Sequence, residues 1–266
     1  MDAPRARDCR ARWADRARRA GAVALEAMAP TRCAGCERPG ALICPRCLTE
    51  LVPIDPVHAC TRCGAPFGDL LCTECGHGGD PSGGTGSAEG DIAPAPDRCL
   101  AAAVFEGPLP RIIHAYKDAG ERRLAPLLAE LMADAALHAE EAAPGRFGGI
   151  VRGADAVTFV PATAAAFARR GFDHMEEIAR SFSRLTGVPY LDALAKRGAS
   201  DQRVLGREER ARSARGAYVP VADVAGMRLL LLDDVVTTGS TVRAAASSLA
   251  SAGAAHIDAL ALARVW

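Results

Sequence analysis

The sequence predicts an α/β protein with a doubly wound parallel sheet, preceded by a small cysteine-rich, metal-binding domain. Three observations support this prediction. Segments with strand character alternate with amphipathic helical segments from residue 99 onward. Four consecutive leucines at 229–232 are typical of a strand that is buried on both faces of a parallel sheet. Eight of the ten cysteines form four Cys-x-x-Cys pairs before residue 76.

The composition limits the size and setting of the protein. A chain of 266 residues can bury the core of one main domain and of a smaller one. The formal net charge is zero, but arginines concentrate in residues 1–32 and basic residues in 196–215. Each cluster either binds phosphate groups or forms a solvated face. The phosphates would belong to a small ligand or to nucleic acid. We expect a cytoplasmic protein, because no apolar run approaches the roughly 20 residues of a membrane span and no secretion signal is recognisable.

The chain is expected to contain four regions. Residues 1–21 are basic and lack a core face, so we expect a disordered N-terminus. Residues 22–75 hold the cysteine pairs, and 76–98 are rich in Gly, Pro and Ser without periodic apolar residues, which is typical of a flexible linker. The α/β domain then occupies residues 99–266.

The paired cysteines predict two structural zinc sites, that is, a double zinc ribbon. Each Cys-x-x-Cys knuckle presents two thiolates to one tetrahedral ion, and two knuckles complete one site. In a cytoplasmic chain this regularity favours metal over disulfides, with redox-active pairs as the alternative. Short loops close at a lower entropic cost, so we favour pairing of successive knuckles over interleaved pairing. The expected ligands are Cys33, Cys36, Cys44, Cys47, Cys60, Cys63, Cys72 and Cys75.

The first half of the α/β domain shows alternating patterns. Apolar residues at spacings of three and four predict helices, and short apolar or β-branched runs predict strands. The expected strands are 100–105, 155–160 and 188–194, and the expected helices are 110–118, 124–138 and 173–186. We expect Leu127, Leu128, Leu131 and Leu137 on the core side of the second helix, and Ile178, Phe182 and Leu185 on that of the third.

Residues 228–241 are the most informative segment. The leucine run stops at Asp233 and Asp234, and adjacent carboxylates at the end of a buried strand repel each other unless a ligand compensates them. Small hydroxyl residues around Gly239 follow, which lets backbone amides approach an anion. A helix that ends at Gly253 and a last strand at 257–263 complete the pattern. Together they predict a phosphate cradle at the carboxyl edge of the sheet; a capped turn without ligand is the alternative.

This segment resembles the phosphoribosyl-pyrophosphate (PRPP) motif of type I phosphoribosyltransferases. The resemblance implies that the acidic pair Asp233 and Asp234 holds the ribose hydroxyls with magnesium nearby. It assigns the 5′-phosphate to Thr237, Thr238, Gly239, Ser240 and Thr241. Purine-salvage members of that family have an acid where this chain has Thr237. The resemblance therefore implies a type I phosphoribosyltransferase-like fold, but not purine chemistry.

The same resemblance suggests where pyrophosphate binds. In type I enzymes a loop after an early strand holds it, which here corresponds to Pro161 and Ala162, with Arg169 or Arg170 supplying positive charge. A polar helix start is the alternative interpretation. Lys117 either reaches the same cleft or is a surface lysine.

The wider pattern is similar to the ComF family of phosphoribosyltransferase-like proteins. Four knuckles precede the PRPP motif, with 113–120 and 169–174 between them. Family members commonly have Asn and Gln where Asp173 and His174 stand, and we interpret His174 as a helix-start residue rather than a catalytic one. The family is associated with DNA uptake in natural competence.

Two functions follow from this resemblance. The first, which we favour, is an enzyme that transfers phosphoribose from PRPP to a nitrogenous acceptor. The second is a non-catalytic PRPP- or nucleotide-binding accessory in DNA uptake that binds single-stranded DNA or a helicase partner. Arg207 and Arg210 lie on the basic segment that suits either a lid over PRPP or a nucleic-acid contact.

Overall fold

The computed structural model describes residues 30–67, 71–72, 75, 96–197 and 217–266. The chain divides into two compact units, Met1–Glu50 and Leu51–Trp266. This border falls inside the expected ribbon domain of residues 22–75, and the expected N-terminal region and most of the expected linker lie outside the described residues. The domain borders inferred from the sequence therefore stay predictions.

The described part of the first unit is a short knuckle fold. The Cys33 carbonyl accepts a hydrogen bond from the Glu37 amide at 2.7 Å, which closes a tight turn, and Glu37 has a positive φ of 62°. The single helix here, α2 (Pro45–Thr49), begins with a proline, which is favourable because the first amides of a helix have no partner inside it.

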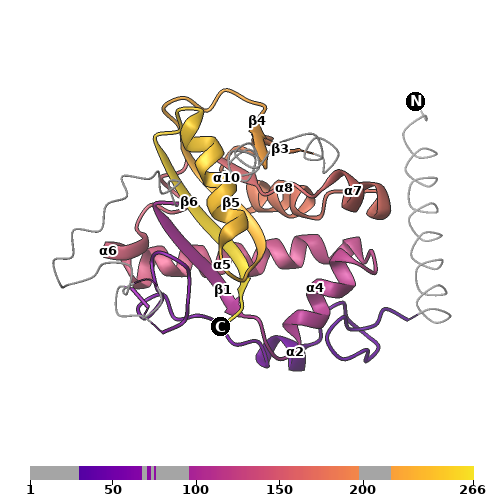
Figure 1. Cartoon of the computed structure of the whole chain (residues 1–266). Coiled ribbons are helices and arrows are strands. Elements are labelled where there is room, and N and C mark those ends of the chain that lie inside the picture. The colour runs from indigo at the N-terminus through magenta and orange to yellow at the C-terminus, as the bar shows by residue number, and fades with distance from the viewer. Residues whose placement is uncertain (1–29, 68–70, 73–74, 76–95, 198–216) are drawn as a thin grey trace, which may run out of the picture. The chain divides into compact units, whose positions relative to one another are not determined.

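A parallel sheet forms the centre of the second unit. Its order is β1-β6-β5-β2, with β1 (Arg98–Val104), β6 (His256–Arg264), β5 (Arg228–Val236) and β2 (Ala156–Phe159) (Figure 1). All three pairings are parallel. Nearly every residue of these strands is buried, as the leucine run predicts for a sheet that is covered on both faces. The predicted α/β class with a doubly wound parallel sheet is confirmed.

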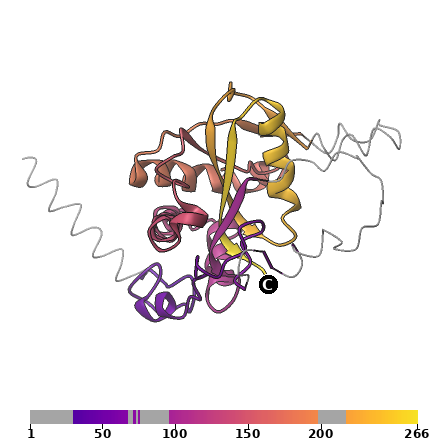
Figure 2. The same ribbon diagram turned by 90° about the vertical axis from the view of Figure 1, so that its left-hand side faces the viewer.

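Helices cover both faces of this sheet. On one face lie α5 (Ala125–Ala142) and α8 (His174–Thr186), which pack against each other, and on the other lies α10 (Ser240–Ser251) (Figure 2). Within the described residues, this unit also contains α4 (Leu109–Lys117), the 3-10 turn η1 (Arg122–Leu124), α6 (Pro144–Phe147) and α7 (Ala164–Arg170). Among the described helices, none has the length and apolar character needed to cross a membrane.

The core faces of two helices differ from the sequence expectation. In α5 only Leu128 of the four expected leucines is fully buried, while Leu127, Leu131 and Leu137 are partly exposed. Five of the eight buried residues of this helix are alanines, namely Ala125, Ala129, Ala133, Ala136 and Ala139. Small side chains let a helix approach its neighbours closely, so alanine takes positions that hydrophobicity alone assigns to leucine. In α8, Ile178 and Phe182 are buried as expected, but Leu185 in the last turn is 50% exposed.

The expected strand at 188–194 is wrong. The structure has one isolated parallel bridge there, between Val157 and Tyr190, flanked by hydrogen bonds to the Pro189 carbonyl and from the Leu191 amide. Pro189 has no amide hydrogen and cannot continue a ladder. Regular pairing resumes in β3 (Leu194–Lys196), antiparallel to β4 (Tyr218–Pro220).

Candidate functional site

The acidic pair lies within the carboxyl-terminal part of β5. The strand continues to Val236, so Asp233 and Asp234 are strand residues, 6% and 8% exposed. Consecutive side chains of a strand point to opposite faces, and Asp234 lies toward α8, where it meets His174. Both carboxylates nevertheless line one cavity at the end of the sheet.

This cavity has a volume of about 390 Å³. It brings together the end of β5, the loop before α7 and the start of α10, which are distant in the sequence. The lining residues are Lys117, Val160, Pro161, Ala162, Thr163, Ala166, Arg170, His174, Lys196, Asp233, Asp234, Val235, Thr237 and Thr241. Most of the site residues expected from the sequence are therefore neighbours in space.

Asp234 is held by two cationic or polar side chains. The Lys117 ammonium donates to its Oδ2, and His174 Nε2 lies 3.1 Å from the same oxygen. Its Oδ1 accepts the Val235 amide hydrogen at 2.7 Å. Burial by itself raises the pKa of Asp234, but the His174 hydrogen bond and the Lys117 charge more than offset it, so the pKa lies below its usual value. Asp234 is therefore ionised at neutral pH.

Asp233 has the opposite character. Burial, and after it the charge of Asp234, raises the pKa of Asp233 to about 8. Its Oδ1 accepts the Asp234 amide hydrogen at 2.9 Å. The two neighbouring acids thus hold one charge between them near pH 7, with the proton on Asp233. A ligand that brings positive charge or hydroxyl donors to this edge stabilises the ionised form of Asp233, so the pair can then carry two negative charges.

Arg170 forms the opposite wall of the cavity. Its side chain is 8% exposed, and its Nη2 lies 3.2 Å from Asp118 Oδ1. Its Nη1 lies 3.3 Å from His174 Nδ1. Since a guanidinium only donates, His174 Nδ1 accepts and the ring proton sits on Nε2, directed at Asp234. The buried Nε of Arg170 has no hydrogen-bond partner among the described residues.

Some polar groups of the loop before α7 are already hydrogen-bonded within the protein. The Ala162 amide donates to Asp173 Oδ2 at 2.7 Å, and Thr163 caps α7 by accepting from the Ala166 amide. Asp173 also caps α8 through the Met175 amide. The Ala162 amide is therefore already bonded to Asp173, although Ala162 lines the cavity. Pro161 and Arg170 also line it, whereas the exposed Arg169 does not.

The loop before α10 has the geometry of an anion cradle. Gly239 precedes the helix with φ +73°, a conformation that suits glycine. Thr238 Oγ1 lies 3.1 Å from Ser240 Oγ, and Arg243 folds back to donate to the Thr238 carbonyl at 2.8 Å. Thr237 and Thr241 line the cavity on either side of this turn. Arg207 and Arg210 lie outside the described residues.

Two titratable side chains of the cavity, His174 and Lys196, were not assigned to the site from the sequence. His174 was interpreted as a helix-start residue, which it is, yet it is 6% exposed and touches Asp234. Lys196 lines the cavity from β3, with its ammonium 5.1 Å from the Tyr218 ring centroid. No local motif marks either residue, because only the packing of distant elements brings them to the acidic pair.

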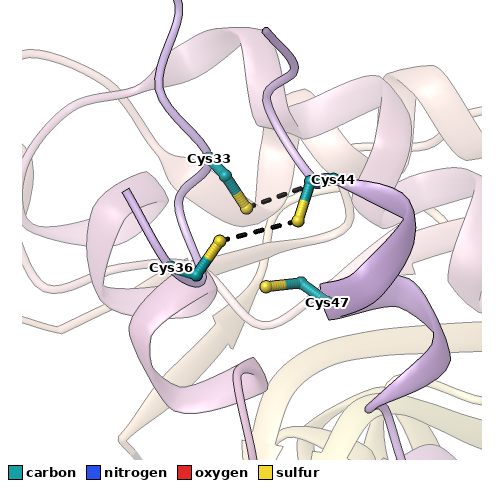
Figure 3. Close-up of side chains that lie close together, drawn as sticks. All are labelled: Cys33, Cys36, Cys44 and Cys47. Carbon is teal, nitrogen blue, oxygen red and sulfur yellow. Dashed lines mark hydrogen bonds between the residues drawn. The ribbon is translucent and has the colours of Figure 1, made fainter. Parts of the chain in front are cut away.

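The eight paired cysteines form two groups of four. Cys33, Cys36, Cys44 and Cys47 point toward one another in the first unit (Figure 3), and Cys60, Cys63, Cys72 and Cys75 do so in the second. Within each group the sulfur atoms lie within 4.8 Å of one another, a spacing and donor set that fit a tetrahedral zinc ion. The favoured pairing of successive knuckles is confirmed.

Backbone amides favour one thiolate in each group, whereas burial raises the pKa of Cys47 in the first group and of Cys75 in the second. Burial raises the pKa of Cys33 and Cys60, but amide hydrogen bonds from the knuckles outweigh it, so the pKa values fall to about 6 and about 7. One of these bonds, from the Cys44 amide to Cys33 Sγ, measures 3.3 Å (Figure 3). Thiolates are the form that binds zinc, so both groups could hold one.

Comparison with known proteins agrees with this geometry. Residues 161–265 match the family described as "Phosphoribosyl transferase domain". Residues 161–265 are therefore similar to a phosphoribosyl transferase domain. The matched segment begins at the loop before α7 and runs through the acidic pair and the α10 loop.

Relatives extend the similarity of this domain toward the cysteine groups. The DNA utilization protein YhgH of Salmonella typhi is 26% identical over 246 residues, which cover 88% of this chain and 97% of the relative. YhgH of Escherichia coli (strain K12) is 28% identical over 169 residues, covering 63% and 72% of the two chains. Together with the domain match and the cysteine groups, these relatives confirm the predicted resemblance to the ComF family.

Two solved structures are also similar. The allosteric regulatory enzyme of purine biosynthesis shares 27% identity at a TM-score of 0.29, covering 41% of this chain and 22% of that one. Glutamine PRPP amidotransferase from B. subtilis, complexed with ADP and GMP, shares 22% identity at a TM-score of 0.33, covering 53% and 25%. The chain spans at most a quarter of the length of either enzyme.

Proposed function

We propose that this protein binds PRPP in the cavity at the carboxyl end of the sheet and transfers its phosphoribosyl group to a nitrogenous acceptor. The observation that carries the proposal is the joint lining of one cavity by the acidic pair Asp233 and Asp234, by Thr237 and Thr241 of the α10 loop, and by the cationic wall. PRPP has a diol, a phosphate monoester and a pyrophosphate, which need these three kinds of surface.

The 5′-phosphate is assigned to residues 237–241. The amides at the start of α10 lack partners inside the helix, and its dipole favours an anion there. The positive φ of Gly239 turns the chain so that these amides face the loop side chains. A β-carbon at Gly239 would lie 3.1 Å from Arg243 Nη1, the end of an exposed, flexible side chain, so the left-handed conformation and not the space is what favours glycine.

The ribose hydroxyls are assigned to the acidic pair. Asp234 already accepts hydrogen bonds from Lys117, His174 and Val235, so it is a fixed, ionised acceptor. Asp233 is the carboxyl group that changes state, because its pKa of about 8 lies close to neutrality. The carboxylate donors fit magnesium, which prefers oxygen and is commonly held through ligand phosphates with only one or two protein carboxylates. When bound, magnesium supplies charge neutralisation for the departing pyrophosphate.

The pyrophosphate is assigned to the cationic wall, formed by Arg170, Lys196 and Lys117. A guanidinium and ammonium groups are suited to charge-assisted bonds with phosphate oxygens, and the partnerless Nε of Arg170 is one such donor. In phosphoribosyl transfer, positive charge develops on the ribose while negative charge develops on pyrophosphate. The residues of this cavity therefore act by orienting PRPP and stabilising those charges.

A second candidate function is an accessory role in DNA handling. The name of the relatives, DNA utilization protein, favours this role. In this alternative the protein binds PRPP or a nucleotide without turnover and contacts single-stranded DNA or a helicase partner. Arg207 and Arg210 are the residues assigned to a DNA contact, or to a lid over PRPP in the first function.

Release of pyrophosphate from PRPP tests the enzymatic proposal. The full chain is mixed with PRPP, magnesium and each of a panel of nucleobases and simple amines. We expect release that depends on one acceptor class and disappears in Arg170→Met, while the exposed Arg169→Met retains it. Two results together would favour the accessory role instead. One is that no acceptor gives pyrophosphate release. The other is a salt-sensitive change in anisotropy on single-stranded DNA that is lost in Arg207→Ala/Arg210→Ala.

A further inference from the structure

The second cysteine group is attached to the edge of the parallel sheet. The Cys99 amide of β1 donates to the Thr61 carbonyl, between Cys60 and Cys63, at 2.7 Å. Gly64 follows that knuckle with φ +71°, and a β-carbon there would lie 3.2 Å from the Ala101 nitrogen of β1. The knuckle backbone therefore rests directly on β1, so a change in the metal site reaches the sheet through backbone contacts.

Arg264 connects this knuckle to the phosphate loop. It is the last residue of β6 and only 5% exposed. Its Nε donates to the Cys63 carbonyl at 3.0 Å, and its Nη1 donates to the Val236 carbonyl at 3.4 Å. Val236 is the last residue of β5, and Thr237, the first residue of the phosphate loop, follows it. One guanidinium thus bridges a cysteine of the metal site and the residue from which the loop departs.

The charge of Arg264 points to the metal-loaded state. Within the described residues, Arg264 forms no ion pair with an acid; its hydrogen bonds go to backbone carbonyls, and its guanidinium carbon lies 5.8 Å from the Trp266 ring centroid. A buried cation without a counter-charge is costly. One zinc ion with four thiolates carries a net charge of about −2. The loaded second group therefore supplies negative charge next to the Cys63 carbonyl that Arg264 binds.

We propose that Arg264 is a positioning residue that couples metal binding at the second cysteine group to the conformation of residues 236–241. Metal in that group fixes the Cys63 carbonyl and attracts the guanidinium, which then adds a second bond to the Val236 carbonyl, beside that of the Val265 amide at 3.0 Å, at the start of the loop. The coupling itself is independent of the ligand; only its consequence for phosphate affinity rests on the proposed function.

Hydrogen exchange measures this coupling directly. Amide exchange of residues 236–241 is followed in the zinc-loaded full chain, in Arg264→Lys, and in Arg228→Lys as the matched control. Arg228 lies at the other end of β5 and also donates its Nε to a carbonyl, that of Gly153, at 2.9 Å. Lysine keeps the charge but has one donor nitrogen instead of a planar fork, so it does not reproduce the separate Nε and Nη1 contacts of Arg264. We expect exchange of 236–241 to rise about tenfold in Arg264→Lys, the effect of losing one charge-assisted bond, and to stay unchanged in Arg228→Lys.

Removing the zinc distinguishes a link between the metal site and the loop from a purely local packing effect of Arg264. Stripping zinc with a chelator should raise exchange of 236–241 in the wild type but add little in Arg264→Lys, because the link is already cut. If the stripped protein unfolds, the rate at which a colorimetric chelator extracts zinc from the loaded protein replaces this comparison. One of the two zinc equivalents should leave faster from Arg264→Lys than from Arg228→Lys.

Equal exchange at 236–241 in Arg264→Lys and the wild type would overturn the proposal, as would equal zinc release from the two lysine variants. A titration with PRPP and magnesium on the same samples separates this outcome from failure of the proposed function. If the wild type does not bind PRPP, the proposed function fails while the exchange data still decide the coupling.

Discussion

His174 Nε2 and Asp234 Oδ2 lie 3.1 Å apart although 60 residues separate them in the chain. This contact places the first turn of α8 against the end of β5. Because Arg170 donates to the other ring nitrogen, the imidazole is oriented to donate its Nε2 hydrogen to the carboxylate. Asp234 is thereby held as a preorganised anion before any ligand arrives.

Replacing His174 tests that relationship. His174→Leu removes the donor and leaves the buried carboxylate with one partner fewer, so PRPP affinity should fall about tenfold or more, as expected for a bond to a charged group. His174→Gln, which retains an N–H donor, should keep most of the affinity. Calorimetry with PRPP and magnesium provides the measurement, and the exposed His138→Leu is the control. An equal loss in the Leu and Gln variants would indicate that ring packing matters and the hydrogen bond does not.

The raised pKa of Asp233 gives the protein a defined pH dependence. Its folded-state pKa is about 8, against about 4 for an unperturbed aspartate, so this group favours the folded state fully below pH 4 and loses that contribution as pH rises toward 8. Asp233→Asn cannot ionise. The free energy of unfolding of the variant should therefore exceed that of the wild type at pH 8 by on the order of 1–3 kcal/mol, and the gap should shrink toward pH 5.

Urea unfolding at pH 5, 6.5 and 8 measures this difference. Asp223→Asn, at an exposed acid, is the matched control and should follow the wild type throughout. A constant offset between Asp233→Asn and the wild type at all three pH values would contradict the assignment of the proton to Asp233.

Loss of the first and of the second cysteine group should affect the stability of the sheet differently. Metal analysis of the purified chain is expected to give about two zinc equivalents, one per four-thiolate site. Cys33→Ser and Cys60→Ser should each lose one. Because the knuckle at Cys60 rests on β1, Cys60→Ser should lower the melting temperature of the unit that contains the sheet, while Cys33→Ser should leave it unchanged. Equal melting temperatures for the sheet in the two variants would contradict this distinction.

Gly239→Ala should affect both the fold and the ligand site. The residue has φ +73°, and an added β-carbon would lie 3.1 Å from Arg243 Nη1. We expect destabilisation of about 1–2 kcal/mol from the left-handed conformation, together with weaker PRPP binding because the loop shifts. Thermal unfolding and calorimetry measure the two effects. Gly145→Ala has open space for a β-carbon and should change neither. Wild-type behaviour of Gly239→Ala in both measurements would contradict the role given to this turn.

Local sequence patterns predicted the parts of the site that depend on neighbouring residues. The leucine run, the acidic pair and the hydroxyl loop define β5 and the start of α10 without reference to the rest of the chain. Spacing alone likewise predicted both cysteine groups. These features follow from periodicity, turn chemistry and ligand geometry, which the sequence displays directly.

The other parts depend on tertiary packing. Lys117 and His174 reach Asp234 from elements 117 and 60 residues away, and no pattern in the sequence specifies that they meet there. The core of α5 is lined mainly by alanines because close packing prevailed over hydrophobicity. Pro189 interrupts the segment expected as a strand, since it lacks the amide that a ladder needs.

The most direct test is calorimetric binding of PRPP with magnesium to the wild type and to Asp233→Asn/Asp234→Asn, with circular dichroism to verify that the double variant is folded. We predict saturable binding to the wild type and none to the double variant, because the ribose hydroxyls lose both carboxylates. Equal affinity for the two proteins would contradict the assignment of PRPP to this cavity.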